Sequence, residues 1–185
     1  MKRFLRKKFG KQECARLRDV YRQKLDWLLH NLIAKSESQA RTLRDKILPT
    51  IALYQALLEC GVPESDAYKT AREFKHAAVR RVARLYKALD AFPFFFRLYR
   101  HLFSIGLKSD NWAVMIQAND NRAFAFTIKK CLWHDACAAY NCPELCGIFC
   151  DSDDILYGTL SRMRFERTET LGAGGSSCDF RFYPR

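Results

Sequence analysis

The chain lacks a long apolar run, and this absence excludes a membrane-spanning helix. Its most aromatic stretch, Ala91 to Phe96, is only six residues long, whereas a spanning helix needs about 20 consecutive apolar residues. The basic start, Met1 to Lys8, has none of the apolar h-region that a secretory signal carries. We therefore expect no membrane partner and a cytoplasmic protein.

The sequence also lacks an internal repeat and a linker rich in proline, glycine and serine. Its 185 residues fit one domain. With 49% apolar and 28% charged residues, the composition is that of a globular protein. We expect a single domain over residues 1–185, with a helical part at 1–106 and a cysteine-rich α/β part at 107–185.

Charge and cysteine are distributed unevenly along the chain. Residues 1–100 hold the whole basic excess behind the formal net charge of +12, while residues 101–185 are close to neutral. The thiols are concentrated in the second part, at Cys131, Cys137, Cys142, Cys146, Cys150 and Cys178. In a reducing cytosol such thiols are expected to serve as free thiols or metal ligands rather than in disulfides.

The first part of the chain has the three- and four-residue apolar spacing of amphipathic helices. Pro49 should kink or split one of these helices, and Gly61 should end it. Helices are predicted over residues 11–34, 38–60, 63–89 and 94–104.

The second part of the chain changes to the period of β-strands. Asn119 to Asn121 is a turn signal, and the glycine-rich residues 172–177 are expected to be a flexible connector. The predicted fold class is α+β, with an N-terminal helical layer packed on a C-terminal antiparallel sheet and a short cysteine-rich helix. Strands are predicted over residues 112–116, 123–128, 162–167 and 179–182.

The strongest chemical signal lies between Asn141 and Asp154. Asn141 or Cys142 can cap a helix on which Cys142, Cys146 and Cys150 share one face. A thiol at a helix N-terminus has a lowered pKa, which favours Cys142 as a nucleophile. Two other interpretations stay open: a buried core face of cysteines, and a metal site, although the spacing is not that of a Cys-x₂-Cys pair.

Acidic residues follow these thiols, and they suit either a general base or a solvated loop. Alternation along residues 163–167 places Arg167 on the inward side of its strand. The same alternation places Cys178 inward and Asp179 on the opposite face. An inward arginine needs a carboxylate, either from the protein as an ordinary ion pair or from a ligand.

Together these motifs resemble the L-2-amino-thiazoline-4-carboxylic acid hydrolase family. The resemblance runs from about residue 40 to the end and implies a bacterial-type hydrolase of cysteine metabolism, which opens a cyclic amidine to give N-carbamoyl-cysteine. It is carried by the string Cys-Pro-Glu-Leu-Cys-x-x-Phe-Cys-Asp-x-Asp that begins at Cys142, and by residues 165–171, 178–180 and 48–57.

The resemblance also implies roles for particular residues. The expected catalytic residues are Cys142, Asp151, Asp154 and Cys178, and the expected substrate-binding residues are Arg167, Cys146, Cys150 and Asp179. Arg167 would hold the substrate carboxylate. The ring carbon would be attacked by the thiol of Cys142 or by a water molecule that an aspartate activates. No cofactor is assigned, and a divalent metal stays open.

Other functions stay open beside a hydrolase with a small-molecule substrate. The glycine-rich loop and the last strand are more distantly similar to small-molecule-binding domains of the 4-vinyl reductase type. A non-catalytic thiol-rich sensor of a small molecule or metal is therefore the alternative. The basic N-terminal part would give salt-dependent affinity for nucleic acid, but its cations are spread around several helices, so we do not expect that partner. A homo-oligomer stays open.

Overall fold

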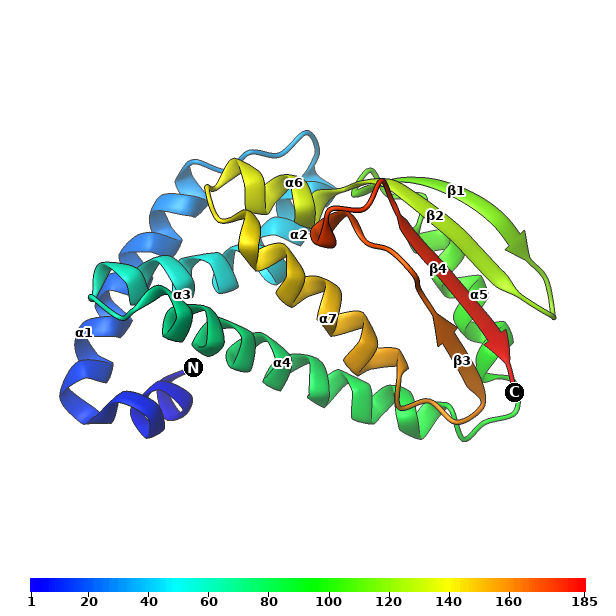
Figure 1. The fold of residues 1–185 in the computed structure, drawn as a ribbon, viewed down its shortest axis with the longest axis horizontal. Helices are drawn as coiled ribbons and strands as arrows, with labels where there is room; N and C mark the ends of the chain where they lie inside the picture. Colours follow the sequence, from blue (N-terminus) through cyan, green and yellow to red (C-terminus); the bar gives the residue numbers. More distant parts are fainter. The chain divides into compact units, whose positions relative to one another are not determined.

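The computed structural model describes residues 1–185, and the chain forms two compact units, Met1–Lys75 and His76–Arg185 (Figure 1). The helix α4 belongs to both units. None of the helices has the length and apolar character needed to cross a membrane. The elements are α1 (Lys2–His30), α2 (Glu37–Thr42), the π-helix η1 (Leu43–Ile47), α3 (Leu48–Glu59), α4 (Glu64–Leu89), α5 (Phe95–Gly106), β1 (Trp112–Asn119), β2 (Phe124–Cys131), α6 (Leu132–Ala139), the 3₁₀-helix η2 (Pro143–Leu145), α7 (Cys146–Tyr157), β3 (Met163–Glu166), the 3₁₀-helix η3 (Leu171–Ala173) and β4 (Cys178–Pro184).

The first unit is helical, as its apolar spacing predicts. Leu17 and Leu28 of α1 are buried, as are Ile51 and Leu53 of α3, and the two helices contact each other. The first helix is longer than predicted, because it begins at Lys2 and continues through a kink at Gly10, whose φ is 79°.

The predicted effects of Pro49 and Gly61 are both confirmed. Proline has no N–H to donate along the helix, and the helical path changes near Pro49 from α2 through the π-turn η1 into α3. Gly61 has a φ of 82°, a left-handed conformation that glycine adopts freely. There the N–H of Val62 donates to the carbonyl of Leu57 at 3.0 Å and closes the helix.

The second unit contains a four-stranded antiparallel sheet in the order β1-β2-β4-β3. The predicted turn at residues 119–121 joins β1 and β2, where the carboxylate of Asp120 accepts the N–H groups of Arg122 and Ala123. The last two strands, β3 and β4, pair antiparallel, with Phe165 opposite Phe182. The fold class is therefore α+β, with a helical N-terminal region and a helix that carries cysteines.

One face of the sheet carries the aromatic core of this unit. Phe124, Phe126 and Phe182 are almost completely buried there. From α5, the ring of Tyr99 lies 5.1 Å from that of Phe182, and from α7 the ring of Tyr157 lies 5.0 Å from it. Both helices thus pack on the same face, and Figure 1 shows α7 running alongside β3. The position of residues 163–184 relative to α7 is fixed by this core.

Two local features differ from the sequence prediction. The helix α6 follows β2 without an intervening turn, and no cap marks its start: its N-cap, Cys131, makes no side-chain cap hydrogen bond. Asn141 does not cap the next helix. It adopts a left-handed φ of 56° and ends α6, where the N–H of Cys142 donates to the carbonyl of Cys137 at 2.8 Å.

Candidate functional site

The α-helix that carries the thiols begins later than the sequence suggests. Cys142 is the N-cap of the short 3₁₀-helix η2 and makes no side-chain cap hydrogen bond. The helix α7 starts at Cys146, so the thiol in its first turn belongs to Cys146. The expectation that Cys142 caps the helical segment is confirmed, with Pro143 and Glu144 in its first turn, but this turn is 3₁₀ rather than α and the Cys142 thiol makes no cap hydrogen bond. Cys142 is buried, with 1% exposure.

Four thiols, which we call the thiol series, lie near one another around the start of α7: Cys137 of α6, then Cys142, Cys146 and Cys150. Cys137 interacts with Cys142 and with Cys146, and Cys146 also interacts with Cys150 one turn later. The neighbouring thiols of Cys137 and Cys150 hold the pKa of Cys146 well below its ordinary range. The same interactions raise the pKa values of Cys137 and Cys150. Among these thiols, Cys146 is the one whose surroundings favour the deprotonated form.

The chain passes very close to two of these sulfur atoms at Gly172. A Cβ atom at this position would lie 2.8 Å from the Sγ of Cys146 and 2.9 Å from the Sγ of Cys150. No side chain fits between the 3₁₀-helix η3 and these thiols. Glycine at 172 is thus what allows the β3–β4 connection to lie directly over the start of α7.

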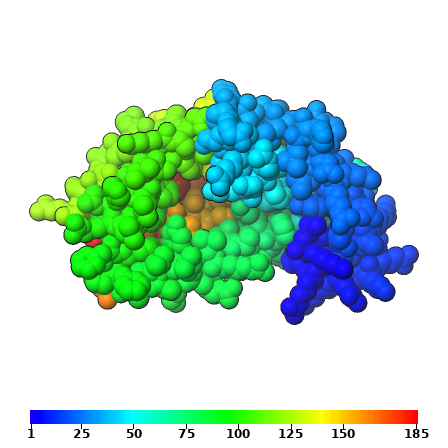
Figure 2. Space-filling model, turned by 180° about the vertical axis from the view of Figure 1, so that it is seen from behind, coloured from blue at the N-terminus to red at the C-terminus, as the bar shows by residue number.

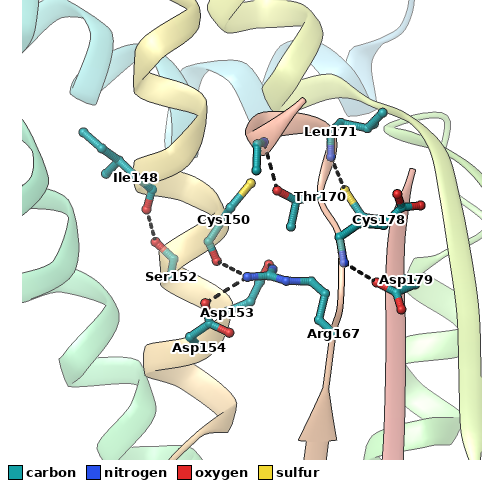
Figure 3. A network of polar contacts seen from close by, with 12 residues as sticks. Ile148, Cys150, Ser152, Asp153, Asp154, Arg167, Thr170, Leu171, Cys178 and Asp179 are labelled. Carbon is teal, nitrogen blue, oxygen red and sulfur yellow. Dashed lines mark hydrogen bonds and ion pairs between the residues drawn. The ribbon is translucent and has the colours of Figure 1, made fainter. Parts of the chain in front are cut away.

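Arg167 fastens the other end of this connection to α7. It donates from Nη1 to Asp153 and from Nη2 to Asp154, both at 2.9 Å, and from Nη2 to the carbonyl of Cys150 at 3.2 Å (Figure 3). Its guanidinium also lies 5.6 Å from the ring centre of Phe180, and its side chain is 9% exposed. The inward direction predicted for Arg167 is confirmed, and its partners are carboxylates of the protein.

Cys178 and Asp179 lie on opposite faces of β4, as the alternation predicts. Cys178 faces the core and accepts the N–H of Leu171 at 3.3 Å. Asp179 accepts the N–H groups of Thr168 and Glu169, both at 2.8 Å, and the hydroxyl of Thr168 at 2.7 Å. Burial raises the pKa of Asp179, but these hydrogen bonds outweigh it and hold the pKa below its ordinary value. Both side chains hold the β3–β4 connection in place.

A pocket of about 310 Å³ lies between α7 and this connection. It brings together four of the eight candidate site residues, namely Cys150, Asp151, Asp154 and Arg167. The other four, Cys142, Cys146, Cys178 and Asp179, are buried and do not line it. The remaining wall comes from Gly147 and from residues 168–170, 172 and 173.

Some functional positions had not been singled out in the sequence. Cys137 lies on the helix α6, which the sequence pattern does not predict, and Thr168 both holds Asp179 and lines the pocket. Thr170 gave a usable signal, because a Ser or Thr residue at the start of a helical turn is a common cap. Its hydroxyl accepts the N–H of Ala173 at 3.1 Å. No group of three or more His, Cys, Asp and Glu side chains is arranged to hold a metal ion.

The comparisons with known proteins point to one family. A model of the L-2-amino-thiazoline-4-carboxylic acid hydrolase family matches residues 40–182, a range that contains the pocket and the whole thiol series. Searches of curated proteins and of solved structures return no match. The family match covers most of the 185 residues, and the chain therefore belongs to the L-2-amino-thiazoline-4-carboxylic acid hydrolase family.

Proposed function

We propose that this protein hydrolyses a small cyclic amidine, the thiazoline ring of L-2-amino-thiazoline-4-carboxylate, to N-carbamoyl-cysteine. Membership of the family supports a hydrolase of this type. The observation that carries the proposal is the pocket wall on which a thiol, two carboxylates and a guanidinium meet, at Cys150, Asp151, Asp154 and Arg167. Its volume of about 310 Å³ suits a small ligand.

The charges of the pocket suit the amidine end of such a substrate. Asp151, Asp154 and Glu169 line it beside a single cation, Arg167. Carboxylates stabilise a cationic ligand group at close range. The protonated amidine is also the more electrophilic form of the ring, so the same charges that bind it favour attack on its carbon.

The thiol nearest to the substrate would be Cys150. Its Sγ and the Sγ of Cys146 both lie within 3 Å of the position of a Cβ atom at Gly172. Cys146, whose pKa is lowered, is the thiol that would accept the proton of Cys150. Passing this proton to Cys146 moves the negative charge to the pocket wall without changing the total charge. The Cys150 sulfur then attacks the carbon of the protonated amidine, and the ring carbon–sulfur bond breaks. The departing sulfur takes the extra proton of the amidine and becomes the substrate thiol. This assignment replaces Cys142 by Cys150 as the nucleophile that we propose.

Water completes the reaction. A carboxylate of the pocket wall, Asp151 or Asp154, accepts a proton from the water as the oxygen of the water attacks the same carbon. The carboxylate later releases this proton to solvent. The bond to the Cys150 sulfur breaks, the urea group of N-carbamoyl-cysteine is released, and the proton that Cys146 holds returns the thiol pair to its starting state. Arg167 keeps Asp154 in position through its 2.9 Å ion pair. It is also the pocket cation available to the substrate carboxylate.

The test is to incubate the purified protein with the thiazoline acid and to measure N-carbamoyl-cysteine. Cys150→Ser and Asp151→Asn should each lower kcat at least about a hundredfold, the usual scale for loss of a nucleophile or general base. Cys60→Ser is the matched control, because Cys60 is half-buried and lies in the first unit. Ligand binding with no turnover by the wild-type protein would instead favour the non-catalytic sensor.

A further inference from the structure

A large apolar surface on the second unit has no role in the proposed chemistry. It is formed by the end of α4, the α4–α5 turn and one side of α5, and we call it the α4–α5 surface. Its side chains are between 37% and 68% exposed: Val82, Leu85, Leu89, Phe92, Phe94, Leu98, Leu102 and Ile105. Exposed apolar side chains that gather on adjacent elements, unlike scattered single ones, mark sites of interaction. In Figure 2 these segments, in green, form part of the outer surface on this side.

The helix α5 contributes to the α4–α5 surface because it has more apolar side chains than its contact with the sheet covers. Phe95, Phe96 and Tyr99 face the sheet and are buried. Leu98 and Leu102, four residues apart, lie on the neighbouring side of the helix. An apolar groove of about 270 Å³ joins this side to α4, and Leu89, Leu98 and Leu102 all line it.

The exposed charges along residues 76–109 have one sign. Between His76 and Ser109 the sequence has seven Lys and Arg residues but one acidic residue, Asp90. Asp90 is completely buried, and its carboxylate accepts the N–H groups of Ser161 and Arg162. It therefore presents no negative charge at the surface.

Several of these cations lie at the surface itself. Arg81 and Arg97 are exposed on the two helices, and Lys108 is exposed just beyond α5. Arg100 is already occupied, because it donates to Asn119 and Asn121 in the β1–β2 turn. The two helices thus present exposed apolar side chains together with exposed cations.

We propose that the α4–α5 surface docks on an anionic lipid surface. Exposed Phe and Leu side chains beside Lys and Arg are the composition of interfacial helices, whose apolar side enters the boundary between headgroups and acyl chains. The cations attract anionic headgroups, and the groove offers apolar walls to an acyl chain. A second copy of the chain is disfavoured as the occupant, because two cationic surfaces repel each other. The prediction of no membrane partner rested on the lack of a spanning run, which docking does not require.

The experiment is flotation of the full chain with lipid vesicles. Vesicles that contain phosphatidylglycerol should carry the protein at low salt, and pure phosphatidylcholine vesicles should not. At about 1 M salt, where the Debye length is about 3 Å, binding should weaken strongly. Arg97→Gln should weaken binding about fivefold, the factor for one cation near an anionic surface. No binding to the anionic vesicles at low salt would overturn the proposal.

A second variant tests the apolar part of the surface. Leu98→Gln with Leu102→Gln should weaken vesicle binding at least about tenfold. Ile33→Gln is the matched control, because Ile33 is 61% exposed in the first unit. Circular dichroism verifies that each variant folds. Vesicle binding that is equal in the two variants, or a dimer in sedimentation that the double substitution dissociates, would assign the surface to another occupant and overturn the proposal.

Discussion

Arg167 is the residue whose surroundings define the site most sharply. Arg167→Gln should lower the free energy of unfolding by roughly 1–3 kcal/mol, because two charge-assisted hydrogen bonds to carboxylates are lost. The cost should stay below the 3–5 kcal/mol of a fully buried pair, since the side chains of Asp153 and Asp154 are 32% and 60% exposed to water. Chemical denaturation measures the change.

Arg164→Gln is the control for this substitution. Arg164 lies on β3, three residues before Arg167, and forms an ion pair with Glu166 at 3.2 Å, but both side chains are more than two-fifths exposed. Exposed pairs of this kind contribute at most about 1 kcal/mol. An equal loss of stability in the two variants would show that Arg167 is not a structural anchor.

The alternation of side chains along a strand predicts the face on which a residue lies better than it predicts the partners of its side chain. The period of two was enough to place Arg167 and Cys178 on the core side and Asp179 on the other. It could not show that the two terminal nitrogens of Arg167 already donate to α7. Ion pairs between residues 13 and 14 positions apart depend on how a helix packs against a strand, which no local pattern encodes.

The connection between β3 and β4 is the element that closes the pocket, and Gly172 tests its position. Gly172→Ala places a methyl group within 3 Å of the sulfurs of Cys146 and Cys150, so the connection must move away from α7. We expect a loss of roughly 1–3 kcal/mol, the usual cost of overpacking. The pocket-lining residues move with it, so turnover should fall as well.

Gly106→Ala is the matched substitution at an open position. A Cβ atom at Gly106 meets nothing within 4 Å, and its φ is not in the left-handed range. Alanine is favoured over glycine in a helix by roughly 0.5–1 kcal/mol. Thermal unfolding should therefore show opposite signs for the two glycine variants. If Gly172→Ala is also neutral or stabilising, the connection does not rest on the thiols.

Elements with strong periodicity were predictable, and short irregular ones were not. The residue pattern placed α4 and the β-hairpins within a few residues of their observed bounds. It treated residues 142–150 as one helix, although η2 precedes α7 there. A single 3₁₀ turn has too few residues to show a period, and this one turn determined which cysteine occupies the helix N-terminus.

At the scale of the whole molecule, the sequence predicted the fold class and family but not the arrangement of the thiols. Spacing along one helix suggested a series of Cys142, Cys146 and Cys150. The thiol series also includes Cys137 of the neighbouring helix α6, whose pKa is raised by Cys142 and Cys146. Contacts between separate helices arise from tertiary packing, and therefore a pattern along one segment cannot reveal them. These contacts also explain why the pKa of Cys146 is lowered while the pKa values of Cys137 and Cys150 are raised.

These opposite pKa shifts should appear in the pH dependence of the free energy of unfolding. The pKa of Cys146 is lowered in the folded protein, so between that value and the ordinary thiol pKa of about 8.5 the unfolded chain binds one more proton. Stability from this group therefore rises with pH across the window and is lost as pH falls through the folded-state pKa. Cys137 and Cys150 have raised pKa values, so their contribution is present below about pH 8.5 and is lost above it.

Cys146→Ser should accordingly remove part of the rise in stability from acid to neutral pH. The difference in free energy of unfolding between wild type and variant should grow as pH increases from about 4 to about 8. Urea denaturation at a series of pH values measures it. Cys60→Ser is the control: burial raises the pKa of Cys60, which gives no rise in this window. A difference for Cys146→Ser that stays constant with pH would mean that Cys146 is protonated in the folded protein, and the proton transfer from Cys150 would then have no acceptor.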